Sequence, residues 1–444
     1  MYADFGGIPW VCRVSICMNV SPLVDIIDFV ADRESRDGKL TDYVSLGVLT
    51  RVVPRYVVDE VINETRSREK RSRSLPAHVV VYFVLALALF RDGYEEVLRK
   101  LVNGLRFARV WSVNWSVPTT GAITQARQRL GSAPLKALFD RVAVPVATAG
   151  TPGAWLGRRR LMAVDGVMID MPDTTENCAR YPKAEGGTRR PSPQLRAVGL
   201  AECSTHVIIA AALGSIRVGE RELAGQLLDA VTDDMLIIAD RGFFSYQMWS
   251  DFLDTGADLL FRAWSTMKLT PVEILSDGTW IAEIRRKTVQ GGKTRILLDN
   301  IGDTRFATHI RVRVVEYQIS GHRDNDGKSE TFRLMTTILD PSDVSAAELA
   351  NTYHQRWELE TAFHELEVQL LGTAGLRSKK PDMVEQEFWG LLVSHYAIRS
   401  FIHEAADSVD IDPDRISFTR TLNIIRRQVT DPAAFSPRND TRQP

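Results

Sequence analysis

Residues 353–370 read YHQRWELETAFHELEVQL, and the interpretation of the whole sequence starts from this stretch. Its apolar residues recur at helical spacing, which predicts an amphipathic helix with a buried face made of Leu359, Phe363, Leu366 and Leu370. At about 100° per residue, a narrow polar stripe beside that face holds Tyr353, Arg356, Glu360 and Glu367. Glu358 and Glu365 point to the opposite side. The spacing therefore predicts that Glu360 and Glu367 are the carboxylates held at the edge of a core.

Two aspartates upstream follow short apolar runs. Residues 235–239, MLIIA, are too few for a helix and do not alternate, so they predict a strand buried on both faces that ends at Asp240. Residues 160–164 predict a similar strand that ends at Asp165, before a second strand at 167–171. Because ligands bind at strand ends in open α/β sheets, both aspartates are candidate site residues.

Asp165, Asp240 and Glu360 together predict an oxygen-rich site for hard divalent cations. Such a site suits two metal ions that clamp the attacking and leaving oxygens of an in-line phosphoryl transfer. Each residue also has a simpler interpretation. Asp165 precedes glycine and is typical of a turn, Asp240 is placed to cap the following loop, and Glu360 is spaced for an ion pair with Arg356.

The last of the three acids, Glu360, belongs to a recognisable sequence signature. Tyr353, Arg356 and Glu360 match the first three residues of a Y-x2-R-x3-E-x6-K signature, so the sequence resembles bacterial insertion-sequence transposases of the DDE type. The resemblance implies an α/β protein with a catalytic core like that of ribonuclease H and the retroviral integrases. It also implies two Mg²⁺ or Mn²⁺ ions bound by the three carboxylates, and DNA contacts by Tyr353 and Arg356 near the scissile phosphate.

The same resemblance implies a function and partners. The expected activity is cut-and-paste transposition: cleavage at the ends of an insertion element and strand transfer into target DNA. The expected partners are the terminal inverted repeats of the element, the target DNA and a second copy of the chain in a homodimeric synaptic complex. Two alternatives stay open at this point, a metal-dependent nuclease of the same fold and a DNA-binding remnant without catalysis.

The sequence departs from the signature at its last position. Glu367 stands where the family has lysine, and an anion does not contact a phosphate. The phosphate-binding role is then either lost or taken by a cation beyond the helix, for which the candidates are Arg377, Lys379 and Lys380.

The spacing of the acidic residues predicts a divided chain. The expected parts are a helical N-terminal DNA-binding domain at 1–150, a catalytic core at 155–258 and 340–405, a β-rich insertion at 259–339, and a C-terminal helix with a loose tail at 406–444. Around the aspartates the core should read strand, strand, strand, helix, strand. Alternating apolar and charged residues within the insertion predict antiparallel strands with one solvated face.

An aromatic residue of the insertion stacks on a flipped base in some members of the family, and Phe332 occupies the matching position. Stacking on a base is worth on the order of 1–3 kcal/mol. The alternative is that Phe332 packs inside the β-rich part, as aromatic residues usually do. Trp264 and Trp280 are weaker candidates for the stacking role.

Two helices are predicted in the N-terminal part. Residues 79–90 are an apolar run too short for a membrane span, so they predict a buried helix. A second helix begins after Thr119 and ends at Gly131, and it carries Arg127 and Arg129 as candidates for DNA-groove contacts. The alternative is that this helix is a surface helix of a small bundle.

Composition limits the class of protein. A chain of 444 residues with 44% hydrophobic residues predicts two to three domains with a sizeable core. Neither a signal peptide nor a transmembrane segment is recognised, and the 4 cysteines lack paired metal spacing, so we expect a cytoplasmic protein without zinc. The resemblance to insertion-sequence transposases implies that it is bacterial and nucleoid-associated. Net charge is −1, but basic residues cluster. The cluster at 158–160 is the favoured DNA-facing group because it precedes the strand to Asp165.

Overall fold

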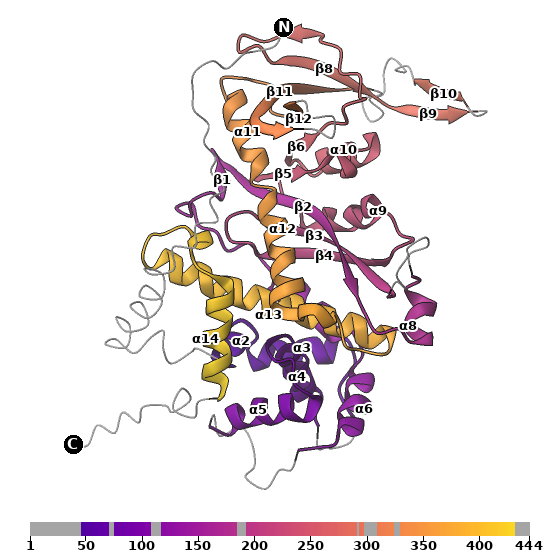
Figure 1. Ribbon diagram of the computed structural model, residues 1–444, viewed down its shortest axis with the longest axis vertical. Helices are drawn as coiled ribbons and strands as arrows, with labels where there is room; N and C mark the ends of the chain where they lie inside the picture. Colours follow the sequence, from indigo (N-terminus) through magenta and orange to yellow (C-terminus); the bar gives the residue numbers. More distant parts are fainter. Residues whose placement is uncertain are drawn as a thin grey trace.

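The computed structural model describes residues 46–70, 75–107, 117–183, 192–290, 293–296, 309–323 and 329–430. The tail predicted from residue 431 lies outside these ranges. Figure 1 shows a helical part at one end of the molecule, a β-rich part at the other and a mixed layer between them. The predicted α/β class is therefore confirmed, and the site described below lies in the middle layer.

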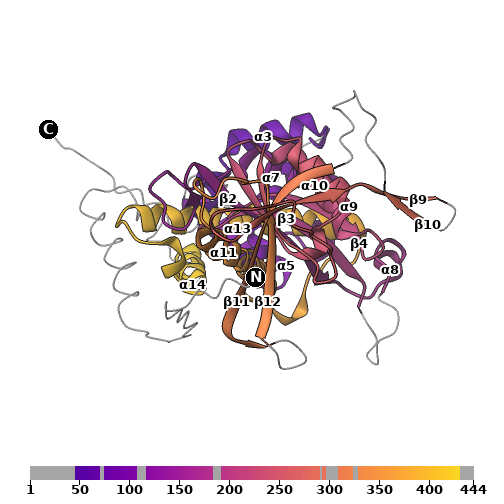
Figure 2. The ribbon, with the colours of Figure 1, turned by 90° about the horizontal axis from the view of Figure 1, so that it is seen from above.

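One large sheet runs through the middle and β-rich parts. Its strand order is β4-β3-β2-β5-β6-β12-β11-β8-β7, and β1 pairs with β2 beside this path. The strands are β1 (Trp155–Leu156), β2 (Arg159–Asp170), β3 (Gln194–Glu202), β4 (Ile208–Ser215), β5 (Met235–Ala239), β6 (Asp258–Arg262), β7 (Glu273–Ile274), β8 (Trp280–Arg285), β11 (His309–Arg323) and β12 (Ser329–Thr336). A separate hairpin, β9 (Lys287–Gln290) with β10 (Lys293–Ile296), projects to one side in Figure 2.

The first five strands of this order form the core of the middle layer. β3 is antiparallel to both of its neighbours, β2 and β4, whereas β5 and β6 run parallel to β2. Between β4 and β5 lie α9 (Glu220–Ala224) and a 3₁₀ turn, η2 (Gly225–Ala230); α10 (Tyr246–Leu253) connects β5 to β6. The predicted succession of three strands, a helix and a strand is therefore confirmed, and the arrangement is ribonuclease H-like.

The prediction of two strands around Asp165 was wrong. β2 is one strand of 12 residues, and Asp165 lies inside it, paired with Gly199 of β3. Gly166 does not form a turn. It provides space instead, because a Cβ atom at this position would lie 3.1 Å from the carboxylate of Glu220. The Asp-Gly pair resembles a turn in sequence, but the ladder to β3 keeps the backbone extended.

The β-rich part is antiparallel, as predicted. β12 pairs with β6 on one side and β11 on the other, and β11 pairs in turn with β8. These strands continue the core sheet without a break, so the β-rich part and the core belong to one hydrogen-bonded sheet.

The helical end is a bundle of α2 (Leu46–Val52), α3 (Arg55–Glu64), α4 (Ala77–Leu89), α5 (Tyr94–Phe107), α6 (Thr120–Leu130) and α7 (Ala133–Val142). The two predicted helices are confirmed as α4 and α6; α4 is buried, and α6 is capped by Thr119 and Gly131 as expected. Among the described helices none is by itself long and apolar enough to span a membrane, although α4 and α5 pass that test as a pair bent by 109°.

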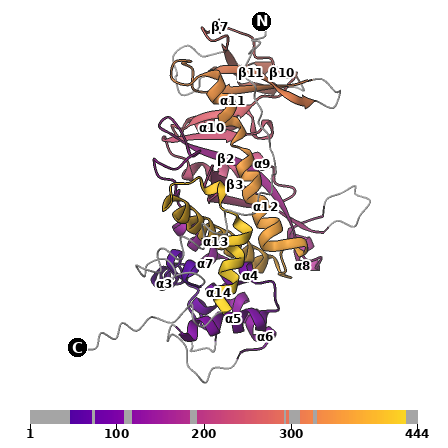
Figure 3. The same cartoon turned by 60° about the vertical axis from the view of Figure 1, so that its left-hand side comes forward.

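The remaining helices join the layers. α13 (Pro381–Asp407) packs against α4 and α7 of the bundle, and α14 (Phe418–Thr430) follows after the short turn η7 (Pro413–Arg415). In Figure 3, α11 (Ala346–His354) and α12 (Trp357–His364) form a column that runs from the β-rich part toward α13. A π-helical segment, η5 (Glu365–Leu371), continues α12, which packs on β2.

Candidate active site

The sheet register brings the two aspartates together. β2 and β5 are parallel neighbours, and Val164 is paired with Ala239. The next residue on each strand is Asp165 or Asp240, so the two carboxylates leave adjacent strands at the same level. Asp240 stands at the end of β5, as predicted, whereas Asp165 stands where β2 loses its parallel neighbour and continues along β3 alone.

The column of α11 and α12 completes the site. Tyr353 lies in the last turn of α11 and donates a hydrogen bond from its hydroxyl to Asp240 Oδ1 at 3.2 Å. Arg356, between the helices, donates from one terminal nitrogen to Asp165 Oδ2 at 2.9 Å and from the other to Glu360 Oε1 at 2.8 Å. The structure thus gathers all five residues of the predicted pattern at one place.

The charges at this place are unbalanced. Arg356 faces two of the three carboxylates, Asp165 and Glu360; its side chain is 10% exposed, and its Nε atom lacks a hydrogen-bond partner among the described residues. Burial raises the pKa of Asp165; the Gly166 amide and Arg356 lower it, and Glu360 and Asp240 raise it again. Burial likewise raises the pKa of the Tyr353 hydroxyl, with Asp240 adding to the effect. Additional positive charge would therefore stabilise the site.

The donor set fits a hard divalent cation. Carboxylate oxygens alone are the ligands that Mg²⁺ and Mn²⁺ prefer, and no thiol or imidazole stands among the three acids. Glu360 is half exposed and so retains access to solvent and to a bound nucleic acid.

Comparison with known proteins identifies the family. The model of the insertion element 4 transposase N-terminal domain matches residues 43–140, and the model of the transposase DDE domain matches residues 156–396. The chain belongs to the DDE transposases. The DDE match spans more than half of the chain and contains all three carboxylates, so this protein is a DNA transposase, an enzyme that acts on DNA with divalent metal.

The chain is also similar to individual proteins. The transposase InsG for insertion sequence element IS4 of Escherichia coli (strain K12) is 26% identical over 428 residues, which cover 95% of this chain and 89% of the relative. The piggyBac transposase in a synaptic complex with hairpin DNA aligns at 12% identity with a TM-score of 0.48, covering 90% of this chain and 83% of that chain.

Arg127 of this transposase does not face a DNA groove, and the prediction that it does was wrong. The residue is fully buried and donates to Gln386 Oε1 at 2.8 Å and to the Tyr94 hydroxyl at 2.6 Å. It also donates to Ser378 Oγ and to the Met383 carbonyl, both at 3.1 Å. Arg127 therefore joins α6 to α13 by hydrogen bonds. Arg129, on the same helix, is exposed.

The cluster at residues 158–160 does not form a basic DNA-facing group either. Arg159 is buried and paired with Asp258 and Asp343, and Arg160 is paired with the buried Glu202. Only Arg158 of the three is exposed. Acidic partners that are distant in sequence neutralise these cations, so they stabilise the sheet edge instead.

Phe332 lies in the interior, in agreement with the packing alternative. Its ring is 5% exposed and stacks on Tyr317 with centroids 5.4 Å apart, and the Arg262 guanidinium lies over it at 4.3 Å. By contrast, Trp264 is 45% exposed directly after β6. Its ring lies 5.3 Å from the guanidinium of Arg241, the residue that follows Asp240. Exposure therefore singles out an aromatic residue that the sequence analysis ranked lower.

The three cations after η5, which were suggested as substitutes for the family lysine, have two different roles. Arg377 donates to the carbonyls of Leu87, Phe90 and Asp92, so it joins this segment to the helical bundle. Lys379 and Lys380 are exposed immediately before α13. Burial raises the pKa of Glu367; His364 lowers it and Asp170 raises it again. Of the three suggested substitutes for the family lysine, only the two lysines remain available to DNA.

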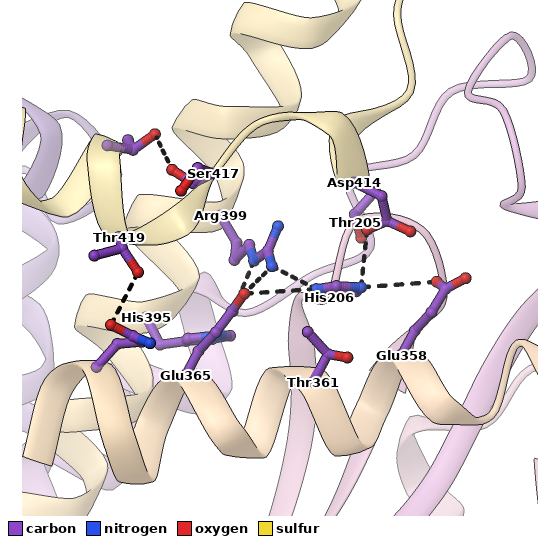
Figure 4. Close-up of polar contacts among 12 residues, drawn as sticks. Thr205, His206, Glu358, Thr361, Glu365, His395, Arg399, Asp414, Ser417 and Thr419 are labelled. Atoms are coloured by element: carbon purple, nitrogen blue, oxygen red, sulfur yellow. Dashed lines mark hydrogen bonds and ion pairs between the residues drawn. The ribbon is translucent and has the colours of Figure 1, made fainter. Parts of the chain in front are cut away.

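The prediction about the carboxylates of α12 and η5 was reversed by the structure. Of the two expected on the far side, Glu365 is buried and Glu358 is only 17% exposed, because α13, η7 and the β3–β4 turn pack against that side. Figure 4 shows the polar residues that meet there. We refer to them as the rear cluster: His206, Glu358, Glu365, His395, Arg399 and Asp414.

The rear cluster predicts a pH-dependent stability. Burial and Arg399 lower the pKa of His206, but Asp414 and Glu365 outweigh them and raise it from 6.5 to about 9. The protonated ring therefore favours the folded state below pH 6.5, and this contribution is lost as the pH rises to 9. Glu358 has the same sign, because burial raises its pKa. We expect the free energy of unfolding to fall by about 3 kcal/mol across this interval.

Urea unfolding of the wild type and His206→Gln at both ends of the interval checks this expectation. The variant, which has no titrating ring, should show a shallower fall. Equal falls in the two proteins would show that other groups carry the pH dependence.

Proposed function

We propose that Asp165, Asp240 and Glu360 bind two Mg²⁺ or Mn²⁺ ions, and that the transposase uses them to cut the ends of its element and to join those ends to target DNA. The observation that carries this proposal is the bridge made by Arg356 between Asp165 and Glu360, with Tyr353 on Asp240. Two of the acids share one cation and the third is held by the neighbouring tyrosine, so three acids from two strands and one helix lie together, as a metal site requires.

The protein residues and the ions have separate tasks in this proposal. Bound divalent ions supply the charge stabilisation of the phosphoryl transfer and activate the attacking oxygen. Arg356 neutralises two carboxylates before they bind metal, and its planar fork suits a phosphate once they do. Tyr353 fixes the orientation of the Asp240 carboxylate. The nucleophile is water in the first step and a freed 3′-hydroxyl in the second, and no histidine base is needed because the bound ions supply most of the charge stabilisation.

Exposed residues supply the proposed DNA contacts. Three accessible cations can pair with the negatively charged phosphate backbone: Lys379, Lys380 and Arg129. Because Phe332 is buried, we assign the stacking role to Trp264, whose indole stands beside Arg241 next to the site. We further propose a homodimer on the paired ends and an action on nucleoid DNA in the cytoplasm.

Removing the indole of Trp264 should weaken binding to unpaired bases. We expect Trp264→Ala to lower the affinity for ends with a single-stranded overhang by about tenfold, since one stacked base is worth roughly 1–3 kcal/mol. Fluorescence anisotropy on overhang and blunt duplexes measures the effect. Trp264→Phe, which keeps an aromatic face, is the matched control. Equal affinities of wild type and Trp264→Ala would exclude the stacking role.

A cleavage and strand-transfer assay on DNA that carries the gene's own flanking ends tests the proposed function. Joined products in Mg²⁺ or Mn²⁺, and none after chelation, support the transposition reaction. Cleavage without joining would favour the nuclease, and binding without cleavage would favour the DNA-binding remnant. Light scattering of the protein bound to paired ends tests the homodimer.

A further inference from the structure

The rear cluster lies on the side of α12 and η5 that faces away from the proposed metal site. Its residues come from four places: the β3–β4 turn (His206), α12 with η5 (Glu358 and Glu365), α13 (His395 and Arg399) and η7 (Asp414). Glu358 precedes Glu360 by two residues, which corresponds to about 200° around a helix. Glu365 follows Glu358 by seven residues and so lies on the same stripe. The helix is therefore held from behind by groups that do not touch the metal site.

Arg399 and Glu365 form the centre of the cluster. Both Glu365 oxygens accept hydrogen bonds from the guanidinium, one of them from Nε at 2.9 Å, and His395 Nε2 lies 2.9 Å from the same carboxylate. Burial alone would raise the pKa of Glu365, but Arg399 and the two histidines outweigh it and lower the pKa, so the residue is an anion. A two-pronged pair of this kind fixes orientation as well as distance.

His206 connects this pair to the C-terminal segment. Its Nε2 atom lies 2.9 Å from Asp414 Oδ1 and 3.9 Å from Glu358 Oε2, and the Ser204 amide donates to Glu358. Ser204 and His206 both have left-handed backbones, with φ of 72° and 60°, so the turn holds an unfavourable conformation that presents the ring to the cluster.

The cluster is not itself a good metal site, although ligand atoms of His206, Glu358 and Asp414 lie within 4.8 Å of one another. A metal ligand needs a free lone pair on the imidazole. Here the ring stands among three carboxylates that favour its protonated form, and the Arg399 guanidinium lies beside its Nδ1 atom. Ion pairing accounts for these contacts.

We propose that Glu365 and Arg399 are positioning residues that set the rotation of α12 and thereby hold the Glu360 carboxylate in place for the metal ions. This inference rests on the proposed function. A carboxylate lies about 6 Å from the helix axis, so a rotation of about 10° moves it by about 1 Å. Mg²⁺ requires nearly ideal octahedral geometry, and a functional site tolerates displacements of only about 0.5 Å. Small rotations of α12 therefore change metal affinity.

Metal binding to the full-length protein without DNA tests the proposal independently of activity. Mn²⁺ titration by calorimetry and by electron paramagnetic resonance measures the affinity, and Glu360→Gln identifies the binding that belongs to the active site. We expect Glu365→Gln to weaken that binding by about tenfold, the usual size of such supporting effects. Arg399→Lys keeps the charge but loses the fork, so its loss should be smaller.

Asp277→Asn is the matched control. Asp277 pairs with the fully buried Arg313 in the β-rich part, at 2.6 Å, and has no contact with α12 among the described residues. It should lower the thermal stability, as Glu365→Gln does, yet leave Mn²⁺ affinity within about twofold. This contrast separates positioning from a general loss of stability.

The outcomes are distinguishable. Unchanged Mn²⁺ affinity in a folded Glu365→Gln variant overturns the positioning role and leaves the proposed function intact. If that variant does not fold, Asp414→Asn at the accessible margin of the cluster replaces it, with an expected loss of about threefold. Wild-type protein without any Mn²⁺ binding that depends on Glu360 overturns both the inference and the proposed metal site.

Discussion

Glu360→Gln should lower the rate of DNA cleavage by about 10³- to 10⁴-fold and leave the fold intact. The amide has the shape of the carboxylate but no charge, so it binds divalent metal poorly, and a loss of several kcal/mol of transition-state stabilisation follows. The side chain is half exposed and its contact with Arg356 can be kept by the amide oxygen, so stability should change by less than about 1 kcal/mol. Gel analysis of cleaved and joined products, with a thermal melt, measures both effects.

Glu367→Gln is the control for this substitution. It makes the same chemical change in the same helical run, at a residue that we do not place in the metal site. Its activity should stay within a few-fold of wild type. Retention of more than a tenth of wild-type activity by Glu360→Gln would show that Glu360 is not a metal ligand, and a Glu367→Gln loss of equal size would point to a general disturbance of the helix.

Arg127→Ala should lower the free energy of unfolding by about 3–5 kcal/mol. The guanidinium is fully buried and donates to Gln386, Tyr94, Ser378 and the Met383 carbonyl, and its loss removes these four hydrogen bonds from the interior. The contact between α6 and α13 depends on these bonds, so the substitution loosens the helical bundle from the helix that supports the core. Urea unfolding measures the change.

Arg129→Ala provides the comparison, because Arg129 is an exposed cation on the same helix. We expect its stability to stay within about 0.5 kcal/mol of wild type and its DNA affinity to fall, with a weaker salt dependence. A stable Arg127→Ala protein that has lost sequence-specific binding would restore the groove-reading role and contradict the buried position.

Local patterns predicted several elements to the residue. β5 was expected at residues 235–239 and lies there, because a short apolar run between polar turns leaves few alternatives. α6 begins after Thr119 and ends at Gly131 for a local reason as well, since a hydroxyl cap and a glycine with positive φ mark its ends. The three acids of the candidate site were recognisable too, and the structure brings them together with Tyr353 and Arg356.

Errors arose where the partner of a residue is distant in the chain. The sequence predicted two strands around Asp165 instead of one, because the pairing of β2 with β3 joins residues that are distant in the chain. Arg127, Arg159 and Arg160 were read as DNA-facing because the acids and amides that bury them lie far along the sequence. An exposed cation and a buried one look alike in sequence, and only the surrounding structure distinguishes them.

The sequence by itself determined the family, the order of the core elements and the three acids, because these depend on residue type and short-range spacing. Tertiary structure alone decided which carboxylates of α12 and η5 are buried. Helical periodicity separates Glu358 and Glu365 from Glu360 but does not say which group meets the protein interior. The packing of α13, η7 and the β3–β4 turn against one side made Glu365 a buried anion and left Glu360 accessible, since burial depends on contacts between distant segments.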